Sequence, residues 1–335
     1  MPDLLSRIHG CIAGLALGDA FGMPGQPTPE ATRARNGGWI TQLLPPPPGD
    51  LTGHAGLRAG QATDDTTAML ALLRSVIRYG EVRQDRVAEA LIAWVESLGG
   101  LDTPYIGPST KRAIRALKEG VNPAESGRAG WTNGAAMRVA PLGFLYAPDL
   151  ERTARAAVDS AYPTHATATA CSAAAAVACA VAICVQPGVT LGDVISAAKT
   201  GADLGEKLGV ESVSPSISRR IDFALHLVDT PASDEQKLRD LYDYIGMGMA
   251  AYETLPVCIA LVHLSAGDPM RAITLAANMG GDTDTVAAIA GAICGAYSGF
   301  EALSAEMVQT VEQVNGYDFR ALAVEYDDLV RGLRA

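Results

Sequence analysis

Two short clusters of carboxylates, separated by more than 200 residues, constrain what this chain can fold into more than any other feature. The first reads Ala62-Thr63-Asp64-Asp65-Thr66-Thr67, and the second reads Gly280-Gly281-Asp282-Thr283-Asp284-Thr285. Each cluster runs directly into an apolar pattern of helical period. Carboxylate and hydroxyl oxygens suit hard divalent cations such as Mg²⁺, Mn²⁺ or Ca²⁺ rather than Zn²⁺ or copper. If the fold brings the clusters together, four carboxylates meet, and their mutual repulsion favours a bound cation.

Apolar spacing near 3.6 residues dominates the chain, whereas the alternation typical of strands is nearly absent. Alanine and glycine are abundant, and there are only 5 phenylalanines. Small side chains let helices pack closely, so the sequence predicts an all-α fold, a compact multi-helix bundle. A further apolar stretch, Val257–Leu264, fits an additional helix. The predicted helices cover residues 4–18, 66–79, 85–98, 109–118, 150–161, 166–185, 190–208, 218–228, 238–255, 269–278, 286–298, 302–315 and 317–333.

The longest irregular segment runs from about Gly25 to Ala62 and contains four consecutive prolines, Pro45-Pro46-Pro47-Pro48. Proline blocks helix formation and stiffens the chain, and long loops in compact domains often carry function. Because the segment ends at the first Asp cluster, we expect it to form a rim or lid over a site. No stretch has the composition of an interdomain linker, so residues 1–335 are predicted to form one domain.

The charge balance and the missing motifs exclude several classes of protein. The net charge is −11 and the pI is about 4.9, which disfavours nonspecific nucleic-acid binding because that binding needs Lys and Arg to meet phosphates. An anionic substrate would then need local positive charge or a metal. The patterns G-x-S-x-G, G-x-x-x-x-G-K-[ST] and a dinucleotide fingerprint are absent, which counts against serine hydrolases, P-loop enzymes and dehydrogenases.

Cysteine usage and the N-terminus favour a cytoplasmic protein. The six cysteines form no C-x-x-C pair and mostly sit in Ala- or Ile-rich surroundings, as buried free thiols do in a reducing compartment. The first residues lack the basic start and long apolar run of a signal peptide. Ala166–Val185 is uncharged over a full span length, but alanine contributes too little transfer energy for insertion. We therefore expect a buried central helix there and no membrane partner.

Each Asp cluster also has a simpler interpretation as a helix N-cap, because Asp and Thr accept bonds from unpaired N–H groups and complement the helix dipole. A cap explains one Asp per cluster, but not two, and not the shared Thr and Asp composition. An EF-hand is excluded for the second cluster, since counting from Asp282 the sixth position is Ala287 and the twelfth is Ile293. Gly280 and Gly281 fit a helix C-cap followed by a tight ligand loop, with a plain helix–helix turn as the alternative.

Other segments place polar residues in otherwise apolar or small-residue surroundings. Asp19 interrupts an apolar N-terminal pattern, and a buried carboxylate needs partners, either a metal ligand that it orients or a helix terminus. Asn133-Gly134 is a turn signal before a small-residue helix start, where backbone N–H groups make an anion site. Arg138 is expected to pair with phosphate or with the acidic clusters, or to stay solvated. His165 precedes the Ala-rich helix, so it is either a site residue or a structural cap.

These segments occur in the order seen in ADP-ribosylglycohydrolases. The paired T-D-D and G-G-D-T-D-T motifs are specific together, and the chain resembles that family from about residue 7 to residue 300. The resemblance implies an all-α, orthogonal multi-helix bundle and a centre of two divalent cations, Mg²⁺ or Mn²⁺. The metal ligands that it implies are Thr63, Asp64, Asp65, Asp282, Asp284 and Thr285. The substrate contacts that it implies are Asp19, Gly107, Ser109, Asn133, Gly134 and His165.

One departure from the family pattern concerns proton transfer. Family members often read G-D-x-x-G-x-P-x-E, and this chain has Gln26 in place of that Glu. Glutamine can position a water or a substrate but does not transfer a proton at neutral pH. The predicted catalytic residues are Asp64, Asp65, Asp284 and Gln26. The proton-transfer role then passes to a water activated by the metals, to Asp65 or to His165, or it is lost.

The resemblance implies a metal-dependent hydrolase of an ADP-ribosyl or related ribosyl glycosidic bond, in a small molecule or on an ADP-ribosylated side chain. Two alternatives stay open. A nucleoside N-ribosidase would use the same site on a smaller substrate, which the acidic composition and the missing Glu favour. A catalytically silent ADP-ribose-binding or crystallin-like protein is the other, which Gln26 favours. Gln26→Glu is expected to raise activity if proton transfer limits the rate.

Overall fold

The computed structural model of the protein describes residues 2–103 and 105–334. Within these ranges the chain forms seventeen α-helices and three short 3₁₀ helices and no strand, with a single β-bridge between Thr167 and Val210. The all-α prediction is confirmed. The helices group into two compact units, residues 1–66 with 219–324 and residues 67–218 with 325–335, and each unit is described by itself.

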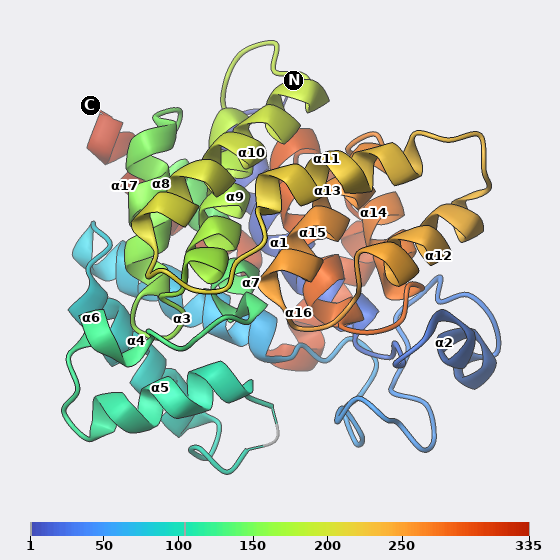
Figure 1. Ribbon diagram of the computed structural model, residues 1–335, viewed down its shortest axis with the longest axis horizontal. Coiled ribbons are helices and arrows are strands. Elements are labelled where there is room, and N and C mark those ends of the chain that lie inside the picture. The colour runs from blue at the N-terminus through green and yellow to red at the C-terminus, as the bar shows by residue number, and fades with distance from the viewer. Residues whose placement is uncertain (1, 104, 335) are drawn as a thin grey trace. The chain divides into compact units, whose positions relative to one another are not determined.

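The first unit is built around α1 (Leu4–Gly22) and α15 (Thr283–Ser298), which pack against each other along their length. α13 (Ala251–Leu264) and α14 (Pro269–Ala277) pack on α15, and α16 (Ala305–Asn315) contacts α1 (Figure 1). The two central helices thereby bring the second Asp cluster beside the end of α1. The unit also holds α2 (Pro29–Asn36), the first turn of α3 (Asp64–Tyr79), most of α11 (Ile217–Val228), α12 (Asp234–Tyr244), the 3₁₀ helix η3 (Phe300–Ala302) and the start of α17 (Phe319–Arg334).

Glycines at every fourth position of α1 let the two central helices approach each other at backbone distance. A Cβ added at Gly10, Gly14, Gly18 or Gly22 would lie 2.2–2.4 Å from a backbone oxygen of α15. Positions four apart lie on one face of a helix, so this face is a groove without side chains. The series ends with Gly22 against the backbone of Thr283, which places the end of α1 at the start of α15.

Gly14→Ala is expected to destabilise the protein by about 3 kcal/mol, because the new methyl group meets the backbone of α15 in a packed interior. Gly332→Ala is the matched control. An added Cβ at Gly332, in α17, has nothing within 4 Å, and alanine is the better helix former. Urea unfolding of both variants and the parent protein measures the difference. Equal unfolding midpoints for the two variants would contradict the close packing of α1 and α15.

The second unit is centred on α9 (Ala168–Ile183), in which all residues from Ala168 to Ala182 are buried. α8 (Leu150–Ala161) and α10 (Leu191–Leu208) pack on α9, as the green and yellow ribbons in Figure 1 show. The prediction of a buried central helix in this stretch is confirmed. The unit also holds the rest of α3, α4 (Gln84–Ser97), α5 (Pro108–Lys118), α6 (Pro123–Ser126), η1 (Asn133–Ala135), α7 (Ala136–Val139), η2 (Ala140–Phe144) and the end of α17.

Most predicted helices match the structure within a few residues, but three predictions differ. The predicted helix at 238–255 is wrong, because the chain breaks between α12 and α13, where Gly246 adopts a φ of 99°. The segment 25–62, predicted to be irregular, contains α2, whose start is capped by the side chain of Thr28. The helices that follow the Asp clusters begin earlier than predicted. The clusters therefore form the first turns of α3 and α15.

Helix α1 and the six cysteines are buried inside the protein. α1 is long and apolar enough to cross a bilayer by length and composition, but 89% of its apolar window is buried inside the protein. A helix in the core of a folded protein can have the same length and apolar composition. Because α1 packs closely against α15, it is such a core helix. All six cysteines are buried free thiols, as predicted.

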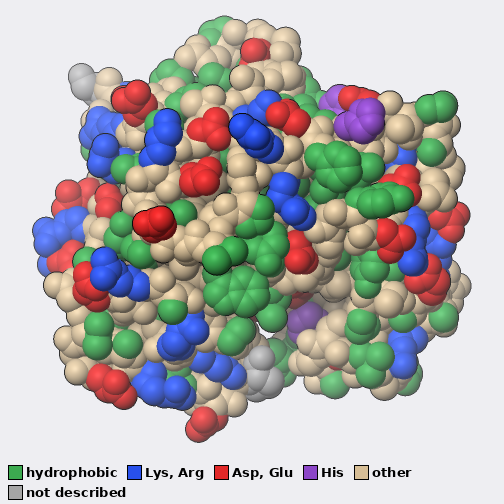
Figure 2. All heavy atoms as spheres, in the orientation of Figure 1, with side chains coloured by type: hydrophobic (Ala, Val, Ile, Leu, Met, Phe, Trp, Pro, Cys, Tyr) green, Lys and Arg blue, Asp and Glu red, His purple; other side chains and the backbone are tan. Residues whose placement is uncertain are grey.

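The exposed charges are mixed in sign. On the face shown in Figure 2, Lys and Arg lie in small groups among Asp and Glu. Surface pairs include Arg239 with Glu30 at 2.6 Å and Arg271 with Asp234 at 2.9 Å, both within the first unit. Exposed pairs of this kind contribute little stability.

Candidate metal centre

The two Asp clusters, far apart in the sequence, meet in the first unit. The hydroxyl of Thr285 donates to Asp65 Oδ2 at 3.3 Å, and the hydroxyl oxygen of Thr63 lies 3.3 Å from the same Asp65 oxygen. Ligand oxygens of Asp19, Asp65 and Asp284 all lie within 4.8 Å of one another. The first turns of α3 and α15 therefore come together with carboxylates between them.

Asp19, near the end of α1, holds the start of α3. Its two carboxylate oxygens accept hydrogen bonds from the backbone N–H groups of Thr63 and Thr66 and from both threonine hydroxyls. The side chain is fully buried, and N–H groups in the first turn have no partner within their own helix. The structure shows that Asp19 bonds the start of α3, and one of its partners there, Thr63, is a predicted metal ligand, so the orienting role stays a prediction. The substrate contact implied by the family resemblance stays a prediction.

Two glycines shape the loop before the second cluster. Gly280 and Gly281 have φ values of 76° and 79°, in the left-handed region that favours glycine, as expected from the sequence. The N–H of Gly281 donates to the backbone carbonyl of Gln26 at 2.9 Å, which fastens the loop to the segment after α1. Asp282 occupies the N-cap position of α15, but its side chain makes no capping hydrogen bond. A helix cap alone therefore does not account for this carboxylate.

Burial and mutual repulsion raise the pKa values of the carboxyl groups in this site. Burial raises the pKa of Asp19 to about 6, and the charge of Asp284 adds to the effect, whereas the threonine hydrogen bonds oppose it. Burial, followed by the charges of Asp284 and Asp19, raises the pKa of Asp64 and of Asp65 well above the usual range. Oδ1 of Asp65 is buried without a hydrogen-bond partner, which is costly for a carboxylate oxygen.

These residues fit a hard divalent cation. A cation beside Asp65 would satisfy the unpartnered Oδ1 and offset the repulsion that raises the carboxyl pKa values. The donors are oxygens, as Mg²⁺ and Mn²⁺ prefer. The residues from both clusters that the sequence predicts as ligands lie together here, namely Thr63, Asp64, Asp65, Asp282, Asp284 and Thr285.

Without metal, the protein is expected to lose stability relative to Asp19→Asn as the pH rises from about 4 to 7. The pKa of Asp19 is 3.8 in the reference state and about 6 in the folded protein. The folded state therefore holds this proton more tightly. The extra stability is present below pH 4 and is lost as the pH rises through 6, and it amounts to about 3 kcal/mol. Urea unfolding in a chelator between pH 4 and 7.5 measures it. Parallel pH profiles for the two proteins would contradict the raised pKa.

Gln26 lies beside the metal centre, but its side chain faces a carboxylate that no sequence motif marks. The residue is fully buried, Nε2 donates to Asp50 Oδ1 at 2.8 Å, and Oε1 accepts from the N–H of Leu51 at 3.2 Å. Asp50 also accepts from the Thr52 hydroxyl at 2.7 Å and from the N–H of His54 at 2.8 Å. Burial acts to raise the pKa of Asp50, but the hydrogen bonds from Gln26 and Thr52 lower it to about 2. Asp50 is thus an ionised anchor for its loop.

His54, for which the sequence predicts no role, enters the same site. Its Nε2 lies 3.3 Å from Asp284 Oδ2, and its Nδ1 lies 3.0 Å from the Met23 carbonyl and 3.2 Å from the Thr52 hydroxyl. Burial lowers the pKa of His54, but the charge of Asp284 and the Met23 carbonyl raise it more, so the net shift is upward. The sequence signal for this contact is the turn Asp50-Leu51-Thr52-Gly53-His54, since Asp and Gly favour turns in which the Asp accepts N–H bonds.

His165 lies in the second unit, with both ring nitrogens engaged. It is buried, and its ring contacts Thr132 Oγ1 at 3.0 Å and Thr164 Oγ1 at 2.8 Å. Burial, followed by the charge of Arg138, lowers the pKa of His165 well below its usual range, so the imidazole is neutral. A Cβ added at Gly134 would lie 2.8 Å from this ring. The turn at Asn133-Gly134 and His165 are therefore packed against each other.

Arg138 supports the same turn from inside the second unit. It is buried and donates to the carbonyls of Gly134 and Ser160, at 2.9 Å and 3.1 Å, and to the Thr164 hydroxyl at 2.8 Å. Burial lowers its pKa to about 10. Of the three roles that the sequence leaves open for Arg138, the solvated one is wrong, because the side chain is buried with two carbonyls and one hydroxyl as acceptors and with Nε unpartnered. Its pairing with phosphate stays a prediction. Asn133, also buried, begins η1 directly before Gly134.

Two more predicted contacts lie at the start of α5. Gly107 is the N-cap residue of this helix, and an added Cβ there has nothing within 4 Å. Ser109 is buried in the first turn. The structure thus places both residues at a helix N-terminus in the second unit, and their contact with substrate stays a prediction.

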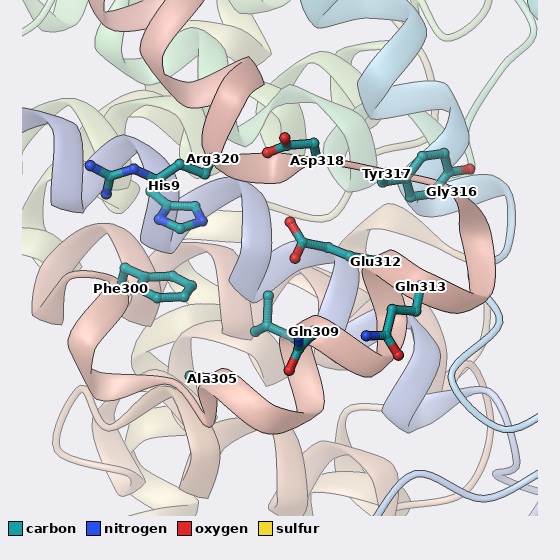
Figure 3. Close-up of a pocket in the computed structure, with 11 residues that line it drawn as sticks. His9, Phe300, Ala305, Gln309, Glu312, Gln313, Gly316, Tyr317, Asp318 and Arg320 are labelled. Atoms are coloured by element: carbon teal, nitrogen blue, oxygen red, sulfur yellow. The ribbon is translucent and has the colours of Figure 1, made fainter.

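A pocket of about 500 Å³ opens in another part of the first unit (Figure 3). His9 stacks on Phe300 with ring centroids 3.7 Å apart, and Glu312 and Asp318 line the same space. Burial, followed by the charge of Arg320, lowers the pKa of His9 to about 4. The described residues that line this pocket include neither Asp cluster, so it is separate from the metal centre.

Comparison with known proteins identifies the family. A family model described as ADP-ribosylglycohydrolase matches residues 1–334, nearly the whole chain. The chain belongs to the ADP-ribosylglycohydrolase family. The resemblance found in the sequence is confirmed, and this ADP-ribosylglycohydrolase is a glycosidase.

Relatives of this ADP-ribosylglycohydrolase match over most of their lengths. The uncharacterized protein YegU of Escherichia coli is 34% identical over 319 residues, which cover 95% of each chain. ADP-ribosylhydrolase ARH3 of Homo sapiens is 29% identical and is matched over 94% of this chain and 90% of its own. ADP-ribosylarginine hydrolase Tri1 of Pseudomonas putida is 28% identical, with coverage of 92% and 74%. A solved structure described as an ADP-ribosylglycohydrolase-related protein complex has a TM-score of 0.70 and 24% identity, covers 98% of this chain and 100% of its own, and supports the fold.

Proposed function

We propose that this protein hydrolyses the glycosidic bond between the ribose of an ADP-ribosyl group and its acceptor, using divalent cations held by Asp65 and Asp284. The observation that carries the proposal is the meeting of two distant Asp clusters around the unpartnered Oδ1 of Asp65. Two relatives are named as an ADP-ribosylhydrolase and an ADP-ribosylarginine hydrolase, which supports an ADP-ribosyl substrate. The proposed cofactor is two ions of Mg²⁺ or Mn²⁺.

The protein's own residues position the reacting groups. When bound, the cations would orient the ribose hydroxyls and polarise the attacking water. Thr63 and Thr285 hold the carboxylate of Asp65, and Asp19 fixes the helix turn that carries it. The transition state of glycoside hydrolysis bears positive charge on the sugar, which the clustered carboxylates, including Asp64, would stabilise.

Proton transfer falls to a group other than Gln26. The amide of Gln26 donates to Asp50 and has no proton to exchange at neutral pH, so its proposed role is positional. Asp65 is one candidate and would act as a general base, because a bound cation would offset the repulsion that raises its pKa and would keep it ionised. His165 is the other candidate from the sequence, but its lowered pKa and its two engaged ring nitrogens make it a weak base.

The proposed substrate contacts come from residues that the family resemblance implies, namely Asp19, Gly107, Ser109, Asn133, Gly134 and His165. The packing of His165 against the turn at residues 133–134 supports the last three. The family match across residues 1–334 supports one functional domain that includes both units. Buried free thiols support a cytoplasmic location, and we propose neither a nucleic-acid nor a membrane partner.

Hydrolysis of a defined panel tests the proposal. The purified protein is incubated with Mg²⁺ or Mn²⁺ and with ADP-ribosyl-arginine, ADP-ribosyl-serine, ADP-ribose 1″-phosphate and nucleosides. ADP-ribose or free base is followed by chromatography. At least one ADP-ribosyl conjugate should be cleaved, and cleavage should stop in a chelator, because the cations supply the polarised water.

Asp65→Asn is the matched variant for this panel, since it keeps the shape of the side chain and removes its charge. It should release no ADP-ribose while remaining folded. Turnover of nucleosides alone would replace the proposal with an N-ribosidase. Tight binding of ADP-ribose without turnover of any conjugate would favour a binding protein.

A further inference from the structure

We propose that His54 is a nitrogen ligand of the cation held by Asp284. This inference rests on the metal centre of the proposed function. The site would then combine carboxylate oxygens with one imidazole nitrogen. His54 lies outside both Asp clusters, in the segment between α2 and α3 that the sequence predicts to be a rim or lid.

The distance between His54 and Asp284 matches that of two ligands on one ion. Nε2 of His54 lies 3.3 Å from Oδ2 of Asp284. Two donor atoms about 2.1 Å from one cation and at right angles to each other lie about 3.0 Å apart. A small adjustment of either side chain would therefore place both atoms on the same cation.

The ring orientation of His54 also suits a ligand. Nδ1 lies 3.0 Å from the Met23 carbonyl, and a carbonyl only accepts, so Nδ1 carries the hydrogen. In the neutral ring, Nε2 then presents its lone pair to Oδ2 of Asp284. In the absence of metal a proton on Nε2 makes this contact an ion pair, and a bound cation would take the place of that proton between the two atoms. Metal-binding histidines commonly donate their second N–H to a carbonyl, which fixes the ring in this way.

The loop that carries His54 is tied to the segment that carries Asp284. Asp50 accepts from the N–H groups of Gly53 and His54, at 2.9 Å and 2.8 Å, which sets the turn. Gln26 donates to Asp50, and the backbone carbonyl of Gln26 accepts from the N–H of Gly281, just before the second Asp cluster. Gln26 thus links the His54 turn to the metal centre. The link needs the amide, because an ionised carboxylate at this position could not donate a hydrogen bond to Asp50.

An imidazole ligand changes the expected choice of metal. Imidazole binds transition metals better than it binds Mg²⁺ or Ca²⁺, which prefer oxygen. The protein should therefore bind Mn²⁺ more tightly than Mg²⁺. His54→Ala should weaken Mn²⁺ binding by about tenfold or more and affect Mg²⁺ less, because the loss removes a nitrogen donor.

Pulsed electron paramagnetic resonance on the full chain with one equivalent of Mn²⁺ tests this ligand directly. The spin of a bound imidazole nitrogen modulates the Mn²⁺ echo. The modulation should be present in the parent protein and absent in His54→Ala. It should persist in His226→Ala, an exposed histidine of α11, and in His165→Ala. Asp50→Asn, which keeps His54 but loosens its turn, should reduce the modulation.

Three results overturn the inference. They are a Mn²⁺ echo without imidazole modulation in the parent protein, a modulation that survives in folded His54→Ala, and one that disappears only in His165→Ala. Where calorimetry on the same samples shows that Mn²⁺ is bound, the proposed metal centre stands and only the ligand assignment fails. If the parent protein binds no Mn²⁺ by calorimetry, both the ligand assignment and the metal-dependent function fail. Circular dichroism confirms that each variant is folded.

Discussion

Asp284→Ala is expected to remove the metal-dependent stabilisation of this protein and to lower its hydrolytic activity by about a thousandfold. Asp284 is the carboxylate of the second cluster that lies within 4.8 Å of Asp19 and Asp65. A cation that binds only the folded state stabilises it by about 2.7 kcal/mol at 100 times the dissociation constant. This gain should vanish for both Mn²⁺ and Mg²⁺, because Asp284 is the carboxylate of the second cluster whose oxygen shares the site with Asp19 and Asp65.

The same substitution should have a different effect when a chelator removes the metal. After burial, the charge of Asp284 is the largest cause of the raised pKa values of Asp64 and Asp65. Its removal relieves repulsion among the remaining carboxylates, so Asp284→Ala should be at least as stable as the parent protein in the chelator. A purely structural role for Asp284 instead predicts destabilisation under both conditions. The sign of the change without metal therefore separates the two roles.

Thermal unfolding at pH 7.5, with a chelator and with a series of Mn²⁺ concentrations, measures both effects of Asp284→Ala. Asp203→Ala is the control, because Asp203 is an exposed carboxylate of α10 and should leave the Mn²⁺ shift unchanged. Asp284→Asn repeats the test with a side chain of the same shape. An undiminished Mn²⁺ shift in both Asp284 variants would count strongly against the metal centre.

The sequence predicts those parts of the fold and of the site that depend on residues close together in the chain. The helical period identifies the all-α class, and each Asp cluster lies where a helix begins, so its side chains are confined to one turn. The glycines before the second cluster adopt the positive φ that their position predicts. Spacing of four in α1 marks a close helix contact, but it does not say that α15 is the partner, because any small-residue helix face fits it.

The rest depends on contacts that no local pattern encodes. His54 meets Asp284, and Gln26 meets Asp50, through a loop whose turn residues are equally compatible with a solvated segment. The break at Gly246 escapes prediction for the opposite reason. The apolar pattern continues across it, and only the backbone conformation of that glycine shows that the helix ends.

Gln26→Glu restores the residue common in the family. At neutral pH it is expected to lower the stability of the protein and its affinity for Mn²⁺. From the sequence alone, the restored carboxyl should raise activity if proton transfer limits the rate. In the structure the amide of Gln26 donates to Asp50 Oδ1 at 2.8 Å from a fully buried position. A carboxylate there would face a second carboxylate instead, and an unpaired buried charge costs about 3 kcal/mol or more.

The cost of Gln26→Glu should depend on pH in a defined direction. Burial and the charge of Asp50 should raise the pKa of the new carboxyl above its value in the unfolded chain, about 4.3. The variant then loses little stability below pH 4, where the carboxyl is protonated and can still donate to Asp50. The loss should grow as the pH rises through the raised pKa. Asp50 keeps the hydrogen bonds from Thr52 and His54 that favour its ionised form, but it loses the one from the Gln26 amide.

Urea unfolding of Gln26→Glu between pH 4 and 8, with activity and Mn²⁺ binding measured on the same samples, tests the positional role of Gln26. Gln26→Met is the comparison, because it removes the amide without adding charge. It should cost about 1–3 kcal/mol with little dependence on pH, since Asp50 then loses one hydrogen bond. If the loop that Gln26 holds carries a metal ligand, both variants should bind Mn²⁺ more weakly than the parent protein. Higher activity in Gln26→Glu at neutral pH, with stability unchanged, would show that position 26 serves proton transfer and that another group can hold Asp50.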